Sequence, residues 1–94
     1  MGALRLSGHI VVPPEDLDAV LAELPIHIQL TREEPGCRAF SVRQSPTDSR
    51  RFDVAEEFVD REAFEMHQRR VRASRWGDIT RNVTRHYEIT ELAG

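Results

Sequence analysis

The chain has 94 residues, of which 39% are hydrophobic and 31% charged, and its formal net charge at pH 7 is -3. This composition predicts one soluble globular domain over residues 1–94 with a single core. Negative net charge argues against nucleic acid as a partner, since binding to phosphates needs a positive field. No apolar run approaches the roughly 18 residues of a membrane helix, so we expect no membrane association.

Cysteine usage and the start of the chain bear on the compartment. The single Cys37 cannot form an internal disulfide. The N-terminal segment lacks the charged start and long apolar stretch of a secretory signal. Together these features favour a cytoplasmic protein in a reducing interior.

The first third of the chain predicts a strand and then an amphipathic helix. Leu4 to Val12 is the expected strand, and Pro13 and Pro14 end it. The helix is expected to run to about Glu33, with a kink or a restart at Pro25, which has no backbone donor. Its apolar residues recur at helical spacing and are Leu17, Val20, Leu21, Leu24 and Ile28. The sequence Glu34-Pro35-Gly36 ends the helix, with Gly36 expected at a positive φ.

A hairpin follows. Residues Arg38 to Ser45 and Arg50 to Val59 alternate at the period of a strand, and residues 46–49 form the connecting loop. In the first of these strands, Phe40 and Val42 are expected to point inward.

The C-terminal part predicts a second helix and a last strand. Asp60 caps the helix, which is expected to extend to about Arg75. Trp76-Gly77 is expected to break it, a short helical piece covers residues 78–83, and Thr84 to Leu92 forms the strand. The arginines at positions 69, 70, 72 and 75 are interpreted as a solvated helix face paired with Glu62 and Glu65; an anion site is the alternative.

The predicted order is strand, helix, strand, strand, helix, strand. With right-handed crossovers this order gives an α+β fold, the ferredoxin-like βαββαβ arrangement with a four-stranded antiparallel sheet and both helices on one face. The opposite face is small and apolar enough to pack against a second subunit, which predicts a homodimer. Its residues include Val11, Ala39, Ser41, Ala55 and Val59.

Two titratable side chains are predicted to point toward one interior. Strand periodicity places Glu56 on the same face as its apolar neighbours Phe52, Val54 and Phe58. His67 falls on the apolar stripe of the second helix. An ionised carboxylate in a core needs a donor or a raised pKa, so these residues are candidates for a catalytic site. The alternative is a structural acceptor and a core histidine whose hydrogen bonds are satisfied.

The sequence resembles the antibiotic biosynthesis monooxygenase family, which includes small quinol monooxygenases. The resemblance covers nearly the whole chain and is carried by Glu34-Pro35-Gly36, by Glu56, and by Ala63-Phe64 with His67. Phe58 stands where many members carry a tryptophan. The resemblance implies a dimeric α+β barrel with a ligand cavity between sheet and helices. It also implies oxidation of phenols or quinols by molecular oxygen with no flavin, haem or metal cofactor.

Under this resemblance His67 is the expected catalytic base, and Glu56 would orient it or stabilise the imidazolium. Substrate-binding side chains for a small aromatic or quinol-like ligand are expected to be Trp76, Tyr87, Phe40, Phe58 and Phe64; ordinary packing is the alternative role for the first two.

Two other functions stay open. One is a dimeric ligand-binding protein with no turnover. The other is a haem-binding or haem-degrading relative, although only Ser7 or His9 could match the first-strand asparagine of those proteins. No metal site is expected, because His9, His27, His67 and His86 follow no ligand motif.

Overall fold

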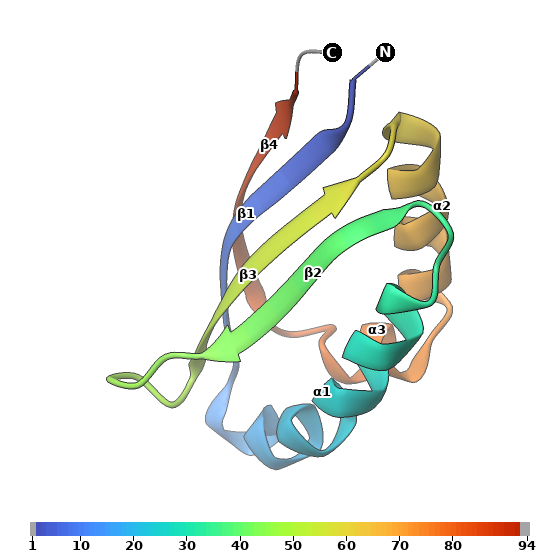
Figure 1. Ribbon diagram of the computed structural model, residues 1–94. Helices are drawn as coiled ribbons and strands as arrows, with labels where there is room; N and C mark the ends of the chain where they lie inside the picture. The colour runs from blue at the N-terminus through green and yellow to red at the C-terminus, as the bar shows by residue number, and fades with distance from the viewer. Residues whose placement is uncertain (1, 93–94) are drawn as a thin grey trace.

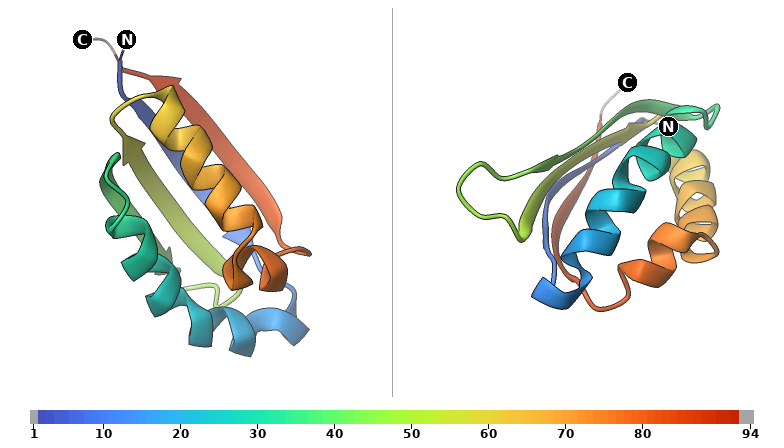
Figure 2. Two further views of the ribbon diagram at one scale, coloured as in Figure 1. Left: turned by 90° about the vertical axis from the view of Figure 1, so that its right-hand side faces the viewer. Right: turned by 90° about the horizontal axis from the view of Figure 1, so that it is seen from below.

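The computed structural model describes residues 2–92 and has a single antiparallel sheet with its helices on one face (Figures 1 and 2). The strand order is β2-β3-β1-β4, which confirms the ferredoxin-like α+β arrangement. The strands are β1 (Leu4–Val11), β2 (Cys37–Gln44), β3 (Arg51–Phe58) and β4 (Thr84–Glu91); the helices are the 3-10 turn η1 (Pro14–Asp16), α1 (Leu17–Arg32), α2 (Arg61–Arg72) and α3 (Arg75–Ile79).

The core lies between the sheet and the helices. Alternate residues of β3 are buried, as its period of two requires, and Phe52 and Phe58 are among the largest fully buried side chains. Glu56 lies in this row, paired in register with Leu6 of β1 on one side and Phe40 of β2 on the other. The sheet therefore holds a carboxylate at its centre, on the face that the helices cover.

The prediction for Pro25 allowed either a kink or a restart of the first helix. α1 is one helix through Pro25, so no restart occurs, and its axis bends along its length, as in the first of these two outcomes (Figure 1). The predicted stripe is only partly buried. Val20 is fully buried, whereas Leu21 is 40% exposed.

Gly36 does not have the predicted positive φ; among the described residues only Gly8 does. The loop instead passes so close to α2 that a side chain at position 36 would overlap the side chain of Ala63. Glycine is thus required here by close packing. Gly8 has a φ of 151°, and a side chain there would overlap the backbone of His86 on β4.

The cap of α2 is confirmed, since Asp60 accepts a hydrogen bond from the Ala63 amide at 2.8 Å. The predicted break at Trp76-Gly77 is wrong. The helix ends at Arg72, and the Ser74 hydroxyl caps α3 by accepting from the Gly77 amide at 3.2 Å, so Trp76 and Gly77 lie inside a helix.

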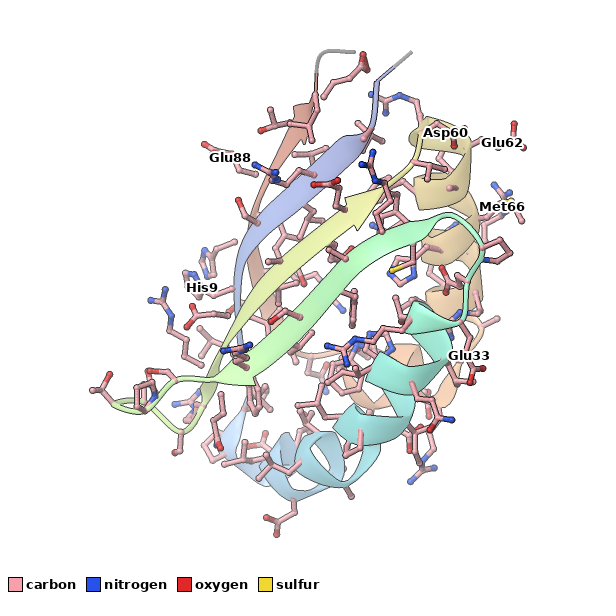
Figure 3. The ribbon with its side chains drawn as sticks, in the orientation of Figure 1. His9, Glu33, Asp60, Glu62, Met66 and Glu88 are labelled. Atoms are coloured by element: carbon pink, nitrogen blue, oxygen red, sulfur yellow. The ribbon has the colours of Figure 1, made fainter. Side chains whose placement is uncertain are left out.

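The sheet face away from the helices carries exposed and partly exposed residues. His9 and Glu88 project from it (Figure 3), and the His9 and His86 rings stack there with centroids 4.6 Å apart. Ala39 and Ala55 are exposed on this face as well. Within residues 2–92, no helix has the length and apolar character needed to cross a membrane.

Candidate active site

A cavity of about 550 Å³ lies between the sheet and the helices. Side chains from all four strands and from α1, α2 and α3 line it, and its size suits a small organic ligand. Five of the seven predicted site residues are in the lining: Glu56, His67, Trp76, Tyr87 and Phe40.

The remaining two, Phe58 and Phe64, are not in the lining of this cavity. They pack edge to face with ring centroids 5.8 Å apart, and Phe58 lies 4.8 Å from the ring of His67. Both rings therefore sit in the core behind the histidine. They can support the imidazole, and they do not face the cavity in which a ligand would lie.

His67 is held in place by a carboxylate that sequence reasoning did not choose. The ring is 3% exposed, and its Nδ1 lies 3.1 Å from both carboxylate oxygens of Glu34, which follows α1. Arg70 donates to Glu34 from the next turn of α2 and also donates to the Thr31 hydroxyl at 2.9 Å. Glu34 is thus the carboxylate within hydrogen-bond distance of the His67 ring, whereas Glu56 was the one expected.

The pairing of the arginines in α2 and α3 also differs from the expectation. Arg70 pairs with Glu34, and Arg75 lies 3.3 Å from Glu23 of α1, instead of pairing with Glu62 and Glu65 along the helix. Arg70 joins α2 to the segment that follows α1, Arg75 joins α3 to α1, and Arg70 fixes the carboxylate beside His67.

The Glu34 contact determines which ring nitrogen is free. A carboxylate accepts hydrogen bonds, so Nδ1 of His67 carries the proton, and Nε2 keeps its lone pair. Nε2 lies 3.8 Å from Glu56 Oε1, which is beyond hydrogen-bond distance. Burial lowers the pKa of His67, the hydrogen bond and charge of Glu34 oppose that effect, and Arg70 adds to it. A neutral imidazole with a free nitrogen on the cavity side is suited to take up a proton.

Glu56 differs from Glu34 because its Oε1 has no hydrogen-bond partner among the described residues. It is 8% exposed. Burial first, and then the negative charge of Glu34, raise the pKa of Glu56 to about 7. Near neutral pH this carboxyl can both hold and release a proton.

His27 of α1 is a cavity residue that the sequence analysis considered only as a metal ligand. Its ring stacks on Trp76 with centroids 4.4 Å apart and planes 4° from parallel, and it meets Phe40 edge to face at 5.3 Å. Burial lowers the pKa of His27 to about 3, so the ring is neutral. The sequence did contain a signal for this position, because His27 lies three residues after Leu24 on the apolar stripe of the first helix. The same kind of spacing identified His67.

Tyr87 brings a phenol to the same cavity from β4. Burial, followed by the charge of Glu56, raises the pKa of Tyr87 to about 12, so its hydroxyl stays protonated and can donate. The neighbouring Arg85 donates to the carbonyl of Thr80 at 3.2 Å. Among the described residues, no three His, Cys, Asp or Glu side chains converge as metal ligands.

Comparison with known proteins identifies the family. The model of the antibiotic biosynthesis monooxygenase family matches residues 4–77, and the chain belongs to this family. A comparison of the sequence with curated proteins gave no match.

Solved structures share the fold over nearly the whole chain. PA3566 from Pseudomonas aeruginosa is 26% identical, with a TM-score of 0.77 and coverage of 98% of this chain and 93% of that one. SO0527 from Shewanella oneidensis is 23% identical, with a TM-score of 0.73 and coverage of 97% and 91%. A protein described as an antibiotic biosynthesis monooxygenase is 23% identical, with a TM-score of 0.73 and coverage of 97% of both chains.

Proposed function

We propose that this protein is a monooxygenase that oxidises a small phenolic or quinol substrate with molecular oxygen and needs no flavin, haem or metal. The observation that carries the proposal is the His67 ring, fixed by Glu34 at Nδ1 and facing the cavity and Glu56 with Nε2. Membership of the antibiotic biosynthesis monooxygenase family supports it.

The proposed reaction begins with proton transfer. A substrate hydroxyl gives its proton to His67 Nε2, and the Glu34 carboxylate stabilises the imidazolium that forms. The phenolate or quinolate donates an electron to oxygen far more readily than the neutral ring does. A bond then forms between a ring carbon and one oxygen atom of the reduced O₂, and protonation of the other oxygen atom gives a hydroperoxide. Loss of water from this hydroperoxide, with the hydrogen of that ring carbon, leaves one oxygen atom in the product as a carbonyl and the other in water.

Glu56 has a different role in this proposal from the one expected of it. A carboxyl with a pKa near 7 beside the reacting ring can return a proton to the developing peroxide or hydroxyl group. Tyr87 can donate a hydrogen bond to a substrate oxygen, and Trp76 offers a flat apolar wall.

We also propose that the protein is a homodimer. The uncovered sheet face carries Ala39 and Ala55 between polar rims, and a chain of 94 residues has limited core of its own. Sedimentation analysis at micromolar concentration should give twice the monomer mass; a monomer would refute this assignment.

Oxygen uptake tests the catalytic proposal. Purified protein treated with chelator should consume oxygen with at least one member of a panel of naphthols and quinols, and a reaction under ¹⁸O₂ should place one labelled atom in the product. If no member of the panel is turned over while some of them bind, the protein is a ligand-binding member of the family without turnover.

A further inference from the structure

A network of four polar side chains connects the end of α1 to the cavity wall at His67. The Arg70 guanidinium donates through Nη2 to the hydroxyl of Thr31 at 2.9 Å and through Nε to the carboxylate of Glu34. Both oxygens of that carboxylate lie 3.1 Å from Nδ1 of His67. Thr31 is 0% exposed and His67 is 3% exposed, whereas the side chain of Arg70 is 31% exposed. The network therefore runs from the protein surface to a buried imidazole.

Thr31 is a fully buried polar residue to which the proposed reaction gives no role. Its hydroxyl accepts the hydrogen bond from Arg70. Because this acceptor belongs to the packed interior, it stays in one place, and it also fixes the guanidinium that binds it. Neither Thr31 nor Arg70 is among the residues that line the cavity.

Glu34 depends on this anchor for its orientation. It lies in the segment between α1 and β2, and its side chain is 18% exposed, so water can compete for the carboxylate. A guanidinium that donates from two nitrogens of one plane binds two acceptors in a fixed geometry. Here the two acceptors are the Thr31 hydroxyl and the Glu34 carboxylate. The carboxylate is thus held with its oxygens toward the His67 ring.

The orientation of Glu34 decides which nitrogen of His67 is basic. A neutral imidazole carries its proton on one nitrogen, and the hydrogen bond made at that nitrogen selects the tautomer. With the carboxylate at Nδ1, the lone pair is on Nε2, the nitrogen nearer Glu56. Without the carboxylate both tautomers would be populated, and a fraction of the molecules would have no lone pair at Nε2.

We infer that Thr31 and Arg70 are positioning residues that keep His67 in the Nδ1–H tautomer by holding Glu34 against the ring. Neither side chain lines the cavity, so both act through Glu34. The inference rests on the proposed function only in treating His67 as the base. The network and its effect on the imidazole require no turnover.

The tautomer of His67 can be measured without a substrate. Long-range ¹H–¹⁵N NMR correlations of the imidazole distinguish a protonated from an unprotonated ring nitrogen. At about pH 8, above the lowered pKa of His67, the wild-type ring should show a protonated Nδ1 and an unprotonated Nε2. Arg70→Met removes the guanidinium and keeps an extended stem, so the two ¹⁵N shifts should move toward each other as the tautomers interconvert. Arg69→Met, the same substitution at the exposed neighbouring residue, should retain the wild-type pattern.

Two further variants separate the geometry of Arg70 from its charge and from folding. Arg70→Lys keeps the charge and loses the planar fork, so it should not restore the wild-type shifts. Thr31→Val removes only the hydroxyl, so it should move the shifts in the same direction as Arg70→Met and by a smaller amount. This variant tests the inference even if Arg70→Met fails to fold.

Wild-type shifts in a folded Arg70→Met, Arg70→Lys or Thr31→Val variant would overturn the inference. A wild-type ring protonated at Nε2 would overturn it as well, because Glu34 would then not select the tautomer.

The inference and the proposed function fail separately. If the wild-type protein takes up no oxygen but the tautomer changes in Arg70→Met, the monooxygenase is refuted and the positioning role stands. If oxygen uptake is observed, Arg70→Met should lower kcat by a few fold with little change in KM, because fewer molecules have a lone pair at Nε2. An unchanged kcat together with unchanged ¹⁵N shifts would refute the positioning role alone.

Discussion

Glu56 and Glu57 are neighbours in β3, yet they lie in opposite environments. Glu57 points to the uncovered sheet face, where Arg5 Nη2 lies 3.2 Å and Arg38 Nε lies 3.4 Å from its carboxylate. Glu56 points to the helices, where burial leaves its Oε1 without a donor and raises its pKa to about 7. One peptide unit therefore separates an ordinary surface ion pair from a perturbed carboxyl.

The two faces thus differ in burial and charge, and we assign the proposed chemistry to the helix-covered face and the proposed dimer contact to the uncovered face. The surface pairs of Glu57 contribute little to stability because water and salt screen them. The unpartnered atoms on the other face lower the stability of the free protein, and such a cost is typical of a site whose partner is a ligand. The predictions below act on one face at a time.

The largest effect is expected from His67. His67→Ala should lower quinol-dependent oxygen uptake by at least about a hundredfold, because the proposed general base is lost. Met66→Ala is the control, since this neighbouring side chain is 56% exposed and points away from the sheet (Figure 3). Oxygen-electrode rates for the two variants and for wild type would check this, and uptake by the His67 variant at the wild-type rate would refute the assignment of the base.

Substitutions on the uncovered sheet face should change the oligomeric state and leave oxygen uptake unchanged. Ala55 pairs in register with Ser7 and with Ser41 at the middle of this face. Ala55→Arg should weaken the proposed dimer roughly a hundredfold or more, because like charges and unpaired charge in an interface cost several kcal/mol. Sedimentation equilibrium measures this, with Ala55→Ser as the conservative control. A variant that dimerises like wild type would place the interface elsewhere.

Glu56 should make stability depend on pH with an unusual sign. Its pKa is raised in the folded state, to about 7 from 4.5, so the folded protein holds a proton that the unfolded chain releases across this range. Stability should therefore fall as the pH rises from 4.5 to 7, by about 3 kcal/mol from this one group. Denaturant unfolding of Glu56→Gln should lack that fall.

Glu57→Gln provides the comparison for the same experiment. This substitution should lower the free energy of unfolding by at most about 1 kcal/mol, and by less at high salt. The variant should retain the pH dependence that comes from Glu56. A Glu56→Gln variant with the same pH dependence as wild type would contradict the raised pKa. In oxygen uptake, Glu56→Gln should retain more activity than His67→Ala.

The smallest effect is expected from Glu34, which acts through His67. Glu34→Gln should lower kcat roughly tenfold, because the imidazolium loses its counter-charge. It should also lower the pKa of His67, since the hydrogen bond and charge of Glu34 raise it. The acid limb of the pH–rate profile should then move to lower pH. Glu33→Gln, one residue away and exposed, should leave both the rate and the profile unchanged; a variant of Glu34 with a wild-type profile would show that its role is structural.

Local sequence patterns were sufficient to predict the fold and the directions in which the Glu56 and His67 side chains point. The alternation in residues 52–58 gave the direction of Glu56, and helical spacing gave the direction of His67, because each period follows from backbone geometry alone. The cap at Asp60 was equally local. Helix breaks depend on weaker signals. The break was predicted at Trp76-Gly77, but it lies between Arg72 and Arg75, because the Ser74 hydroxyl caps a new helix that includes Gly77.

Partners across long sequence separations were decided only by the tertiary structure. Glu34 meets His67 over 33 residues of sequence, and His27 stacks on Trp76 from a different helix. Periodicity determines which way a side chain points, but the packing of α1 and of α2 against α3 determines what it meets there. The sequence by itself determined that a carboxyl and an imidazole face one interior. Only the packed structure decided that a second carboxylate fixes the imidazole and that a second histidine faces the same cavity.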